Sequence, residues 1–249
     1  GNGMSRAQVR TNTWQVGIQD GPASDGPNPD TATAPRATGA WQIHEFSFAP
    51  TNTGTIVQHW INGTNVAAFT GPETNGLGGL ILAANVQAQL FLNVDIAEVF
   101  VFSKLFSAAE RAAVNGWLLS NWTQVVPGPD AASVYAWFKG DAGMEIGADN
   151  YSVTRWTNYG TQVISGTTPQ SRDLTQLTSA PKKTYLLLGD NTPVGAVTFD
   201  GNDGIWQTKA NFGTITSNRT LIVRARLHNH TPQGFLFDAT SYSPGLTRA

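Results

Sequence analysis

Short stretches in which apolar and polar residues alternate recur along the chain and predict many β-strands. In residues 41–49 apolar side chains fall near every second position, whereas residues 95–102 form the continuous apolar run of a buried strand. Asn62-Gly63 predicts a type I′ hairpin turn, because both central positions of that turn need a positive φ. Further strands are expected at residues 7–19, 55–69, 80–84, 89–92, 134–138, 152–156, 184–188, 196–199 and 220–227. This pattern predicts an all-β fold, a two-sheet antiparallel jelly-roll sandwich.

One segment has helical rather than strand periodicity. Ser107 and Glu110 have the spacing of a capping box, and apolar residues then follow on one helical face. These features predict one short helix at about residues 107–120. Pro127-Gly-Pro129 indicates a stiff linker at residues 126–132, and residues 20–40 are expected to form a long exposed loop.

Composition narrows the function classes. Only 13% of the 249 residues are charged and the net charge is −2, so no basic surface for nucleic acid is expected. No apolar run is long enough to cross a membrane, which argues against membrane insertion. The chain has no cysteine, which excludes a disulfide scaffold and Cys-ligated metal sites. Sequons for N-glycosylation, whose use the sequence leaves open, occur at Asn62, Asn121, Asn150, Asn218 and Asn229.

The two ends of the chain read as one continuous piece of structure. Residues 235–249 followed by residues 1–17 make a strand, a glycine-rich turn and another strand. We therefore expect residues 235–249 and 1–19 to form neighbouring antiparallel strands. The apolar side chains of this assembly junction are expected to be Val9, Trp14, Phe235 and Phe237.

The motifs resemble those of laminin-G-like domains of the concanavalin A-like lectin/glucanase superfamily. The opening strand is similar to residues 134–143, and the family's Trp-x-Asn-x-Gly and Phe-Asp-Gly motifs are similar to residues 153–160 and 197–204. The family's second half resembles residues 41–63, and its closing strand and helix resemble residues 95–111, although Val94 stands where the family usually has Gly. The resemblance covers nearly the whole chain, but in circularly permuted order.

This resemblance implies a jelly roll whose halves are exchanged in the sequence. Residues 1–125 would be the C-terminal half and residues 133–249 the N-terminal half, completed within the chain or with a neighbouring copy. Three explanations stay open: a permutant closed on itself, one period of a tandem array, or halves that pair with those of the next copy and propagate into a fibre.

A glycoside hydrolase needs two carboxyl groups close together, one protonated and one ionised. Asp95 and Glu98 are the nearest candidates, but they are three residues apart and are expected to point to opposite faces of a strand. Glu45 and Glu145 stand alone in the sequence, and His44 and Glu45 also diverge. The sequence therefore favours a protein without catalytic activity, in which Glu98 has a structural role.

Metal and cofactor signals are weak. Asp200 and Asp203 flank Gly201-Asn202 and resemble a Ca²⁺ site, although turns also select these residue types for backbone reasons. His228 and His230 would share one face of a strand, but the following Thr231-Pro232 favours a loop tip. No cofactor is indicated.

The first functional hypothesis is a non-enzymatic, extracellular or cell-surface adhesion or structural module that associates head to tail with other copies of itself. The alternative is a lectin-like carbohydrate-binding module, with Trp14, Trp60 and Trp206 as candidate platforms for glycans, although such residues more often fill a core. A glycoside hydrolase or lyase is the second alternative.

Overall fold

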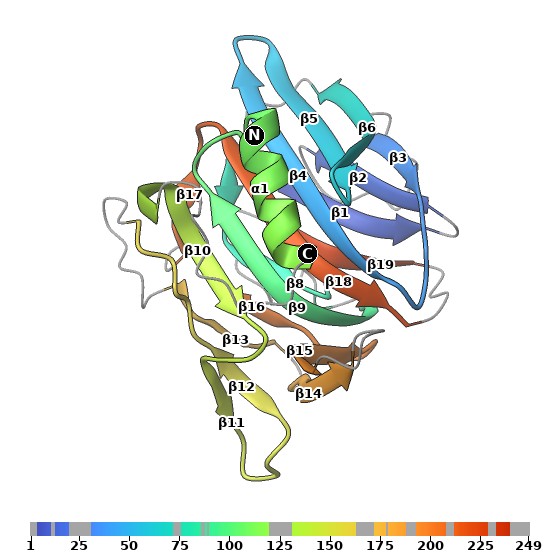
Figure 1. Ribbon diagram of the computed structural model, residues 1–249, viewed down its shortest axis with the longest axis vertical. Coiled ribbons are helices and arrows are strands. Elements are labelled where there is room, and N and C mark those ends of the chain that lie inside the picture. The colour runs from blue at the N-terminus through green and yellow to red at the C-terminus, as the bar shows by residue number, and fades with distance from the viewer. Residues whose placement is uncertain are drawn as a thin grey trace, which may run out of the picture.

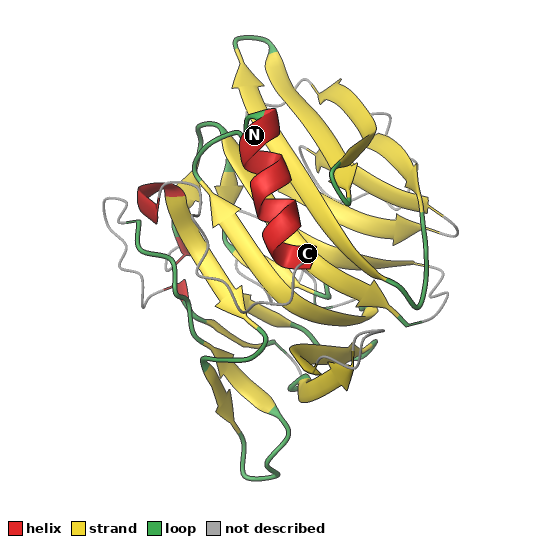
Figure 2. Cartoon of the chain, viewed as in Figure 1, coloured by secondary structure: helices red, strands yellow, loops and turns green. Residues whose placement is uncertain are grey.

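The chain forms two stacked antiparallel β-sheets with one helix on the outer face of one sheet (Figures 1 and 2). The structure is a computed structural model. It describes residues 4–10, 13–19, 31–71, 76–85, 88, 90–119, 131–162, 172–177, 179–187, 193–207, 212–228 and 233–239. The predicted all-β two-sheet sandwich is confirmed.

The first sheet has nine strands in the described part of the chain, and every pairing is antiparallel. In spatial order they are β11 (Met144–Ile146), β12 (Val153–Trp156), β13 (Leu174–Gln176), β16 (Ile205–Gln207), β8 (Leu80–Leu82), β19 (Gln233–Ala239), β1 (Met4–Arg10), β2 (Thr13–Gln19) and β3 (Thr31–Pro35).

The second sheet has eight strands in the same described segments. Their order is β14 (Lys182–Leu187), β15 (Pro193–Asp200), β9 (Asn93–Phe102), β18 (Arg219–Leu227), β4 (Trp41–Thr51), β5 (Gly54–Ile61) and β6 (Thr64–Gly71), with β10 (Val134–Lys139) also paired to β9. A small ladder joins β7 (Leu77–Gly78) to β17 (Thr214–Ile215). A 3-10 turn, η1 (Ala131–Ser133), precedes β10.

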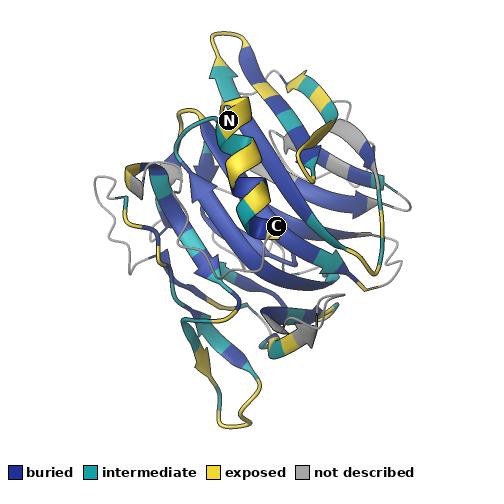
Figure 3. Ribbon diagram, in the orientation of Figure 1, coloured by how far each residue is buried: buried dark blue, intermediate teal, exposed yellow. Residues whose placement is uncertain are grey.

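Helix α1 (Ala108–Leu119) lies along the outer face of the second sheet (Figure 1). Its Val114 and Leu118 pack on Phe100, Phe102 and Ile222 of the sheet below. The expected capping box forms, because the Ser107 backbone N–H donates to Glu110 Oε2 at 2.9 Å. Because one side of α1 packs on the sheet, the helix is buried on that side and exposed on the other (Figure 3). Among the described residues, no helix has the length and apolar character needed to span a bilayer.

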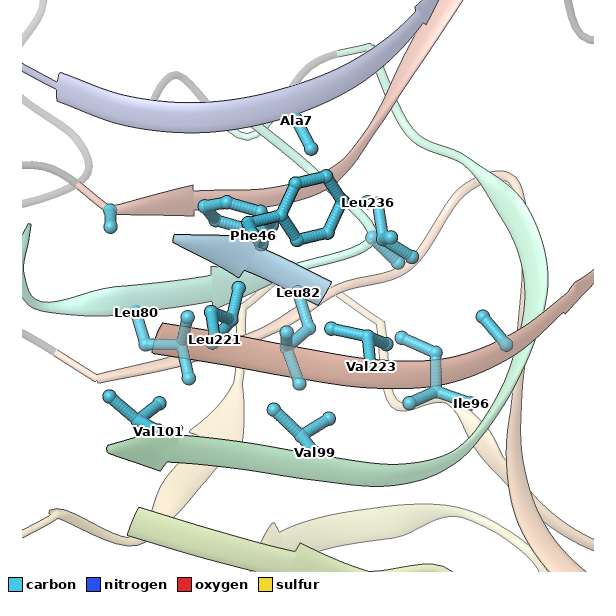
Figure 4. Packing of buried hydrophobic residues seen from close by; sticks show 14 of the residues in the cluster. Ala7, Phe46, Leu80, Leu82, Ile96, Val99, Val101, Leu221, Val223 and Leu236 are labelled. Carbon is cyan, nitrogen blue, oxygen red and sulfur yellow. The ribbon is translucent and has the colours of Figure 1, made fainter. Parts of the chain in front are cut away.

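The main core lies between the sheets and draws on both halves of the chain. We call β1–β9 with α1 the N-terminal half, and β10–β19 the C-terminal half. Figure 4 shows Phe46 and Leu82 of the N-terminal half in one cluster with Leu221, Val223 and Leu236 of the C-terminal half. Neither half therefore holds a complete apolar core.

The halves interleave in both sheets. In the second sheet β18 lies between β4 and β9, and in the first sheet β19 lies between β1 and β8. All four flanking strands belong to the N-terminal half, although β18 and β19 belong to the C-terminal half. The expected antiparallel pairing of the chain ends is confirmed for β1 and β19, with Ala7 opposite Phe237 and Val9 opposite Gly234. The rest of the expected junction, residues 240–249 and 1–3, lies outside the described residues.

Several local expectations can be compared with the structure. The hairpin turn between β5 and β6 has φ values of 50° at Asn62 and 80° at Gly63, as a type I′ turn requires. The exposed loop expected at residues 20–40 is wrong in part, because Thr31–Pro35 pairs with β2 as strand β3. The strand expected at residues 89–92 is also wrong, since residues 90–92 lie outside strands. Most of the expected linker, residues 126–130, lies outside the described residues.

Candidate functional site

The outer face of the second sheet holds a cluster of charged side chains, which we call the outer-face cluster: Asp95, Glu98, Arg224, Arg226 and His228. Asp95 is fully buried on β9 and accepts hydrogen bonds from Arg226 Nη2 at 2.8 Å and from Thr198 Oγ1 at 2.6 Å. His228 Nε2 lies 2.8 Å from Asp95 Oδ1. Three partners thus hold one carboxylate in place, and the arginine compensates its charge.

Glu98 is buried beside Asp95 but has a different environment. Its Oε1 accepts a hydrogen bond of 2.6 Å from Trp137 Nε1, whereas its Oε2 has no hydrogen-bond partner among the described residues. Burial raises the pKa of Glu98 to about 8, and the nearby Asp141 acts in the same direction. At neutral pH the cluster therefore favours a protonated Glu98.

The expectation that Asp95 and Glu98 point to opposite faces is wrong. In the ladder between β18 and β9, Arg226 lies opposite Asp95 and Arg224 lies opposite Glu98. The register shifts between these two positions, so that Ala97 of β9 is an extra residue with no opposite residue on β18. This β-bulge restores both carboxyl groups to the outer face, because it adds one residue to the usual alternation. The bulge has the same effect on the opposite face of β9, where Ile96 and Val99 are three residues apart and both face the main core.

Two glycines explain why the bulge forms there. At Ala97 strand β9 changes its edge partner from β15 to β10. The Gly140 N–H donates to the Ala97 carbonyl at 2.7 Å, and a Cβ at Gly140 would lie 2.2 Å from the Gly195 carbonyl oxygen. Three backbones therefore meet at a distance that only glycine permits.

The sequence could have revealed more of this cluster than we inferred from it. Arg224 and Arg226 are two residues apart on a strand, and such residues share a face. Both guanidinium groups lie over the Trp41 ring, at 5.6 and 5.4 Å from its centroid. The position of Glu98 depends on the bulge, for which the β9 sequence gives no signal.

A third acid on this face, Glu45, is paired rather than alone. Arg111 of α1 donates to both Glu45 oxygens at 2.9 Å, and its guanidinium stacks on Trp60 at 3.9 Å from the ring centroid. His44 points to the opposite face, as expected. The ion pair and the stacked ring attach α1 to the sheet. Glu145 pairs with Arg155 in an exposed contact.

The three tryptophans named as candidate platforms for glycans occupy different environments. Trp14 is 1% exposed in the main core, and Trp60 is 7% exposed beneath Arg111. Neither indole offers a face to a sugar, so the carbohydrate hypothesis loses its structural basis at these two positions. Trp206 is half-buried on β16 and packs on Ile81 at the outer face of the first sheet.

A more exposed aromatic group lies beside the outer-face cluster. Tyr159 is 40% exposed, and its ring meets Trp137 edge-on with centroids 6.3 Å apart. Lys139 Nζ lies 4.4 Å from the Trp137 ring centroid and 5.5 Å from that of Tyr159. Together these residues form a surface with aromatic faces and a hydrogen-bond donor.

The turn proposed for Ca²⁺ uses its carboxylates to hold its own backbone. Asp200 Oδ1 accepts from the Asn202 N–H at 2.9 Å, and Asp203 Oδ1 accepts from the Asp200 N–H at 3.1 Å. Burial raises the pKa of Asp203 to about 7, with a further contribution from Asp200. Within the described segments, no group of three or more His, Asp or Glu side chains is placed to hold a metal ion. His230 lies outside the described residues.

The residues expected at the assembly junction are all buried. Val9, Trp14 and Phe237 belong to the main core, and Phe235 is 2% exposed. Phe237 packs edge-on against Phe46 at 5.1 Å between centroids. In this structure the junction is closed within one chain.

Comparison of the sequence with protein-family models and with curated proteins gives no match.

The buried acid predicts a measurable pH dependence. Because the folded-state pKa of Glu98 lies above its ordinary value of 4.5, the protonated carboxyl group contributes stability in full below pH 4.5, and this contribution is lost as the pH rises through about 8. Relative to Glu98→Gln, the wild type should lose about 1.4 kcal/mol of unfolding free energy per pH unit across this window. Urea unfolding from pH 4 to 9 measures the difference. A constant difference at every pH would contradict the assignment.

Proposed function

We propose that the protein is a non-enzymatic structural module that associates with other copies of itself, in an extracellular or cell-surface setting. The observation that carries this proposal is the interleaving of the halves, in which β18 and β19 each lie between two strands of the N-terminal half. The same contacts form when the C-terminal half comes from a second copy. Each copy then offers one incomplete half at either end, and the assembly grows head to tail.

The surface composition supports this proposal. The chain has a net charge of −2 and few charged residues, so copies repel each other weakly. The outer-face acids also favour a structural role, because Asp95 is 0% and Glu98 2% exposed. A substrate bond cannot reach carboxyl groups buried to this extent. We therefore do not propose glycoside hydrolase or lyase chemistry at this cluster.

The laminin-G-like assignment is the finer part of the proposal. It names residues 1–125 and 133–249 as exchanged halves of one jelly roll, and the interleaved sandwich is compatible with that assignment. The structure itself gives the coarser description: two antiparallel sheets and one helix.

Disulfide trapping tests the exchange, because the chain has no cysteine of its own. Ser47 on β4 lies opposite Thr220 on β18, and directly opposed residues are close enough for a disulfide. Chains with Ser47→Cys are mixed with chains carrying Thr220→Cys, unfolded, refolded together and oxidised. We expect a disulfide-linked dimer, because exchange places β18 of one copy beside β4 of the other.

The matched control uses two positions of the same half. Ser47 also lies opposite Gln58 on β5, and exchange of halves never brings these two positions together across copies. A mixture of Ser47→Cys and Gln58→Cys chains should therefore give no disulfide-linked dimer. The proposal fails if the two mixtures give equal dimer, or if light scattering shows a strict monomer across concentrations.

The second candidate function is glycan binding at the surface formed by Tyr159, Trp137 and Lys139. The observation that favours it is a solvent-facing aromatic ring beside a lysine that can donate hydrogen bonds. Small-molecule sites combine apolar rings with a few polar groups in this way.

A glycan panel tests this candidate with a matched pair of variants. Tyr159→Ala should weaken binding about tenfold, the effect of losing one ring contact of about 1.4 kcal/mol. Tyr185→Ala removes a tyrosine that is 65% exposed on the edge strand β14 and has no ring contact with Tyr159, Trp137 or Lys139 among the described residues, and it should leave binding unchanged. A panel without binding at millimolar glycan excludes the candidate.

A further inference from the structure

Two histidines form a pair inside the main core. His44 on β4 and His59 on β5 are each 1% exposed, and His44 Nδ1 lies 3.1 Å from His59 Nε2. One imidazole must donate this hydrogen bond and the other accept it, so the geometry needs a proton on only one of the two facing nitrogens. The remaining ring nitrogen of His59, Nδ1, has no partner in the described part of the chain.

The pair is surrounded by apolar side chains. The centroid of the Trp14 ring of β2 lies 4.5 Å from that of the His44 imidazole, and the centroid of the Phe46 ring lies 4.4 Å from that of the His59 imidazole. Ala67 of β6 is opposite His59 in register. A positive charge at this place would therefore have no aqueous or polar environment to stabilise it.

Both inserted strands of the C-terminal half contact this region. Val223 of β18 is opposite His44 in register, and Phe237 of β19 packs on Phe46 beside the pair. The histidines thus lie where β18 and β19 enter the N-terminal half. A change of charge here acts directly on the contact between the two halves.

No countercharge faces the pair from the elements packed against it. On β4 Glu45 points to the outer face and binds Arg111, and on β18 Arg224 points to the outer-face cluster. On β19 Asp238 alternates with the core residues Phe237 and Ala239. On the core-facing side of β18, Arg219 lies over the Phe48 ring at 5.0 Å from its centroid, and its charge has the same sign as that of a protonated imidazole. Within the described residues of β2, β5 and β6 no acid and no further base faces the two rings.

We propose that His44 and His59 form an acid-sensitive latch, which holds β18 and β19 in place while both imidazoles are neutral and loosens them when either becomes protonated. What the latch would regulate rests on the proposed function, since loosening these two strands frees the C-terminal half to complete another copy. The latch itself is a property of one chain and can be tested without assembly.

The direction of the pH dependence follows from the burial. Burial lowers the pKa of His44 to about 3 and that of His59 well below its ordinary 6.5, with His44 adding to the second shift. The folded state therefore excludes protons that the unfolded chain binds below pH 6.5. The latch contributes fully to stability above pH 6.5, and this contribution is lost as the pH falls toward 3.

Unfolding measured between pH 7.5 and 4.5 tests the latch. For each unit by which the pH falls below 6.5, protonation of one imidazole in the unfolded chain should raise the unfolding equilibrium constant about tenfold. Protonation of both should raise it about a hundredfold per pH unit. The double variant His44→Leu/His59→Leu should lack this component, while the other titrating groups are common to both proteins. Equal slopes for wild type and double variant would overturn the proposal.

A matched control and a second measurement complete the test. Phe46→Leu removes a ring stacked on His59 and lowers stability, but its slope against pH should equal that of the wild type. Imidazole NMR of the folded wild type needs no variant: His44 and His59 should both stay neutral at pH 5.5. Titration of either near pH 6.5 in the folded protein would overturn the latch.

Disulfide trapping separates the latch from the proposed function. Ser47→Cys and Thr220→Cys chains are mixed at pH 5, returned to pH 7.5 and oxidised. We expect more dimer than after mixing at pH 7.5, and no such increase when both histidines are leucine. Dimer that is independent of pH would overturn the regulation, whereas a complete lack of dimer would overturn the proposed function and leave the latch standing.

Discussion

The packing of both halves into one apolar core is the constraint on which the rest of the structure depends. β18 forms its ladder with β4 and β9, and β19 forms its ladder with β1 and β8. Without these two strands the N-terminal half would have a gap in each sheet, with unpaired backbone groups and uncovered side chains such as Phe46 and Leu82. Stability therefore requires both halves, whether they come from one copy or two.

The same two strands explain the buried polar groups on both faces of the second sheet. On the outer face, β18 brings Arg224 and Arg226 to the acids of β9, and the bulge at Ala97 aligns those acids with them. On the inner face, β18 and β19 cover the two histidines. The charge of Asp95 is compensated on the outer side, whereas the two histidines on the inner side are neutral and have no countercharge. Acid should therefore act on the inner side first, where a proton has no partner.

The sequence predicted the elements that depend on local signals. The helix begins at its capping box, and the Asn62-Gly63 turn adopts positive φ at both residues, because each signal works within a few neighbouring residues. The pairing of the chain ends was also predictable, from the way residues 235–249 continue into residues 1–17. Features that depend on distant backbones were not predictable. The bulge needs Gly140 and Gly195 at Ala97, and the burial of Trp60 needs Arg111 above it.

Reconstitution of the two halves from separate chains tests the central claim most directly. Residues 1–125 and 126–249 would be produced apart, examined alone by circular dichroism and hydrogen exchange, and then mixed. The account predicts that neither piece folds alone, and that the mixture forms a folded one-to-one complex with the exchange protection of the intact chain. Independent cooperative folding of either piece would contradict the account, because that half would then contain a complete apolar core.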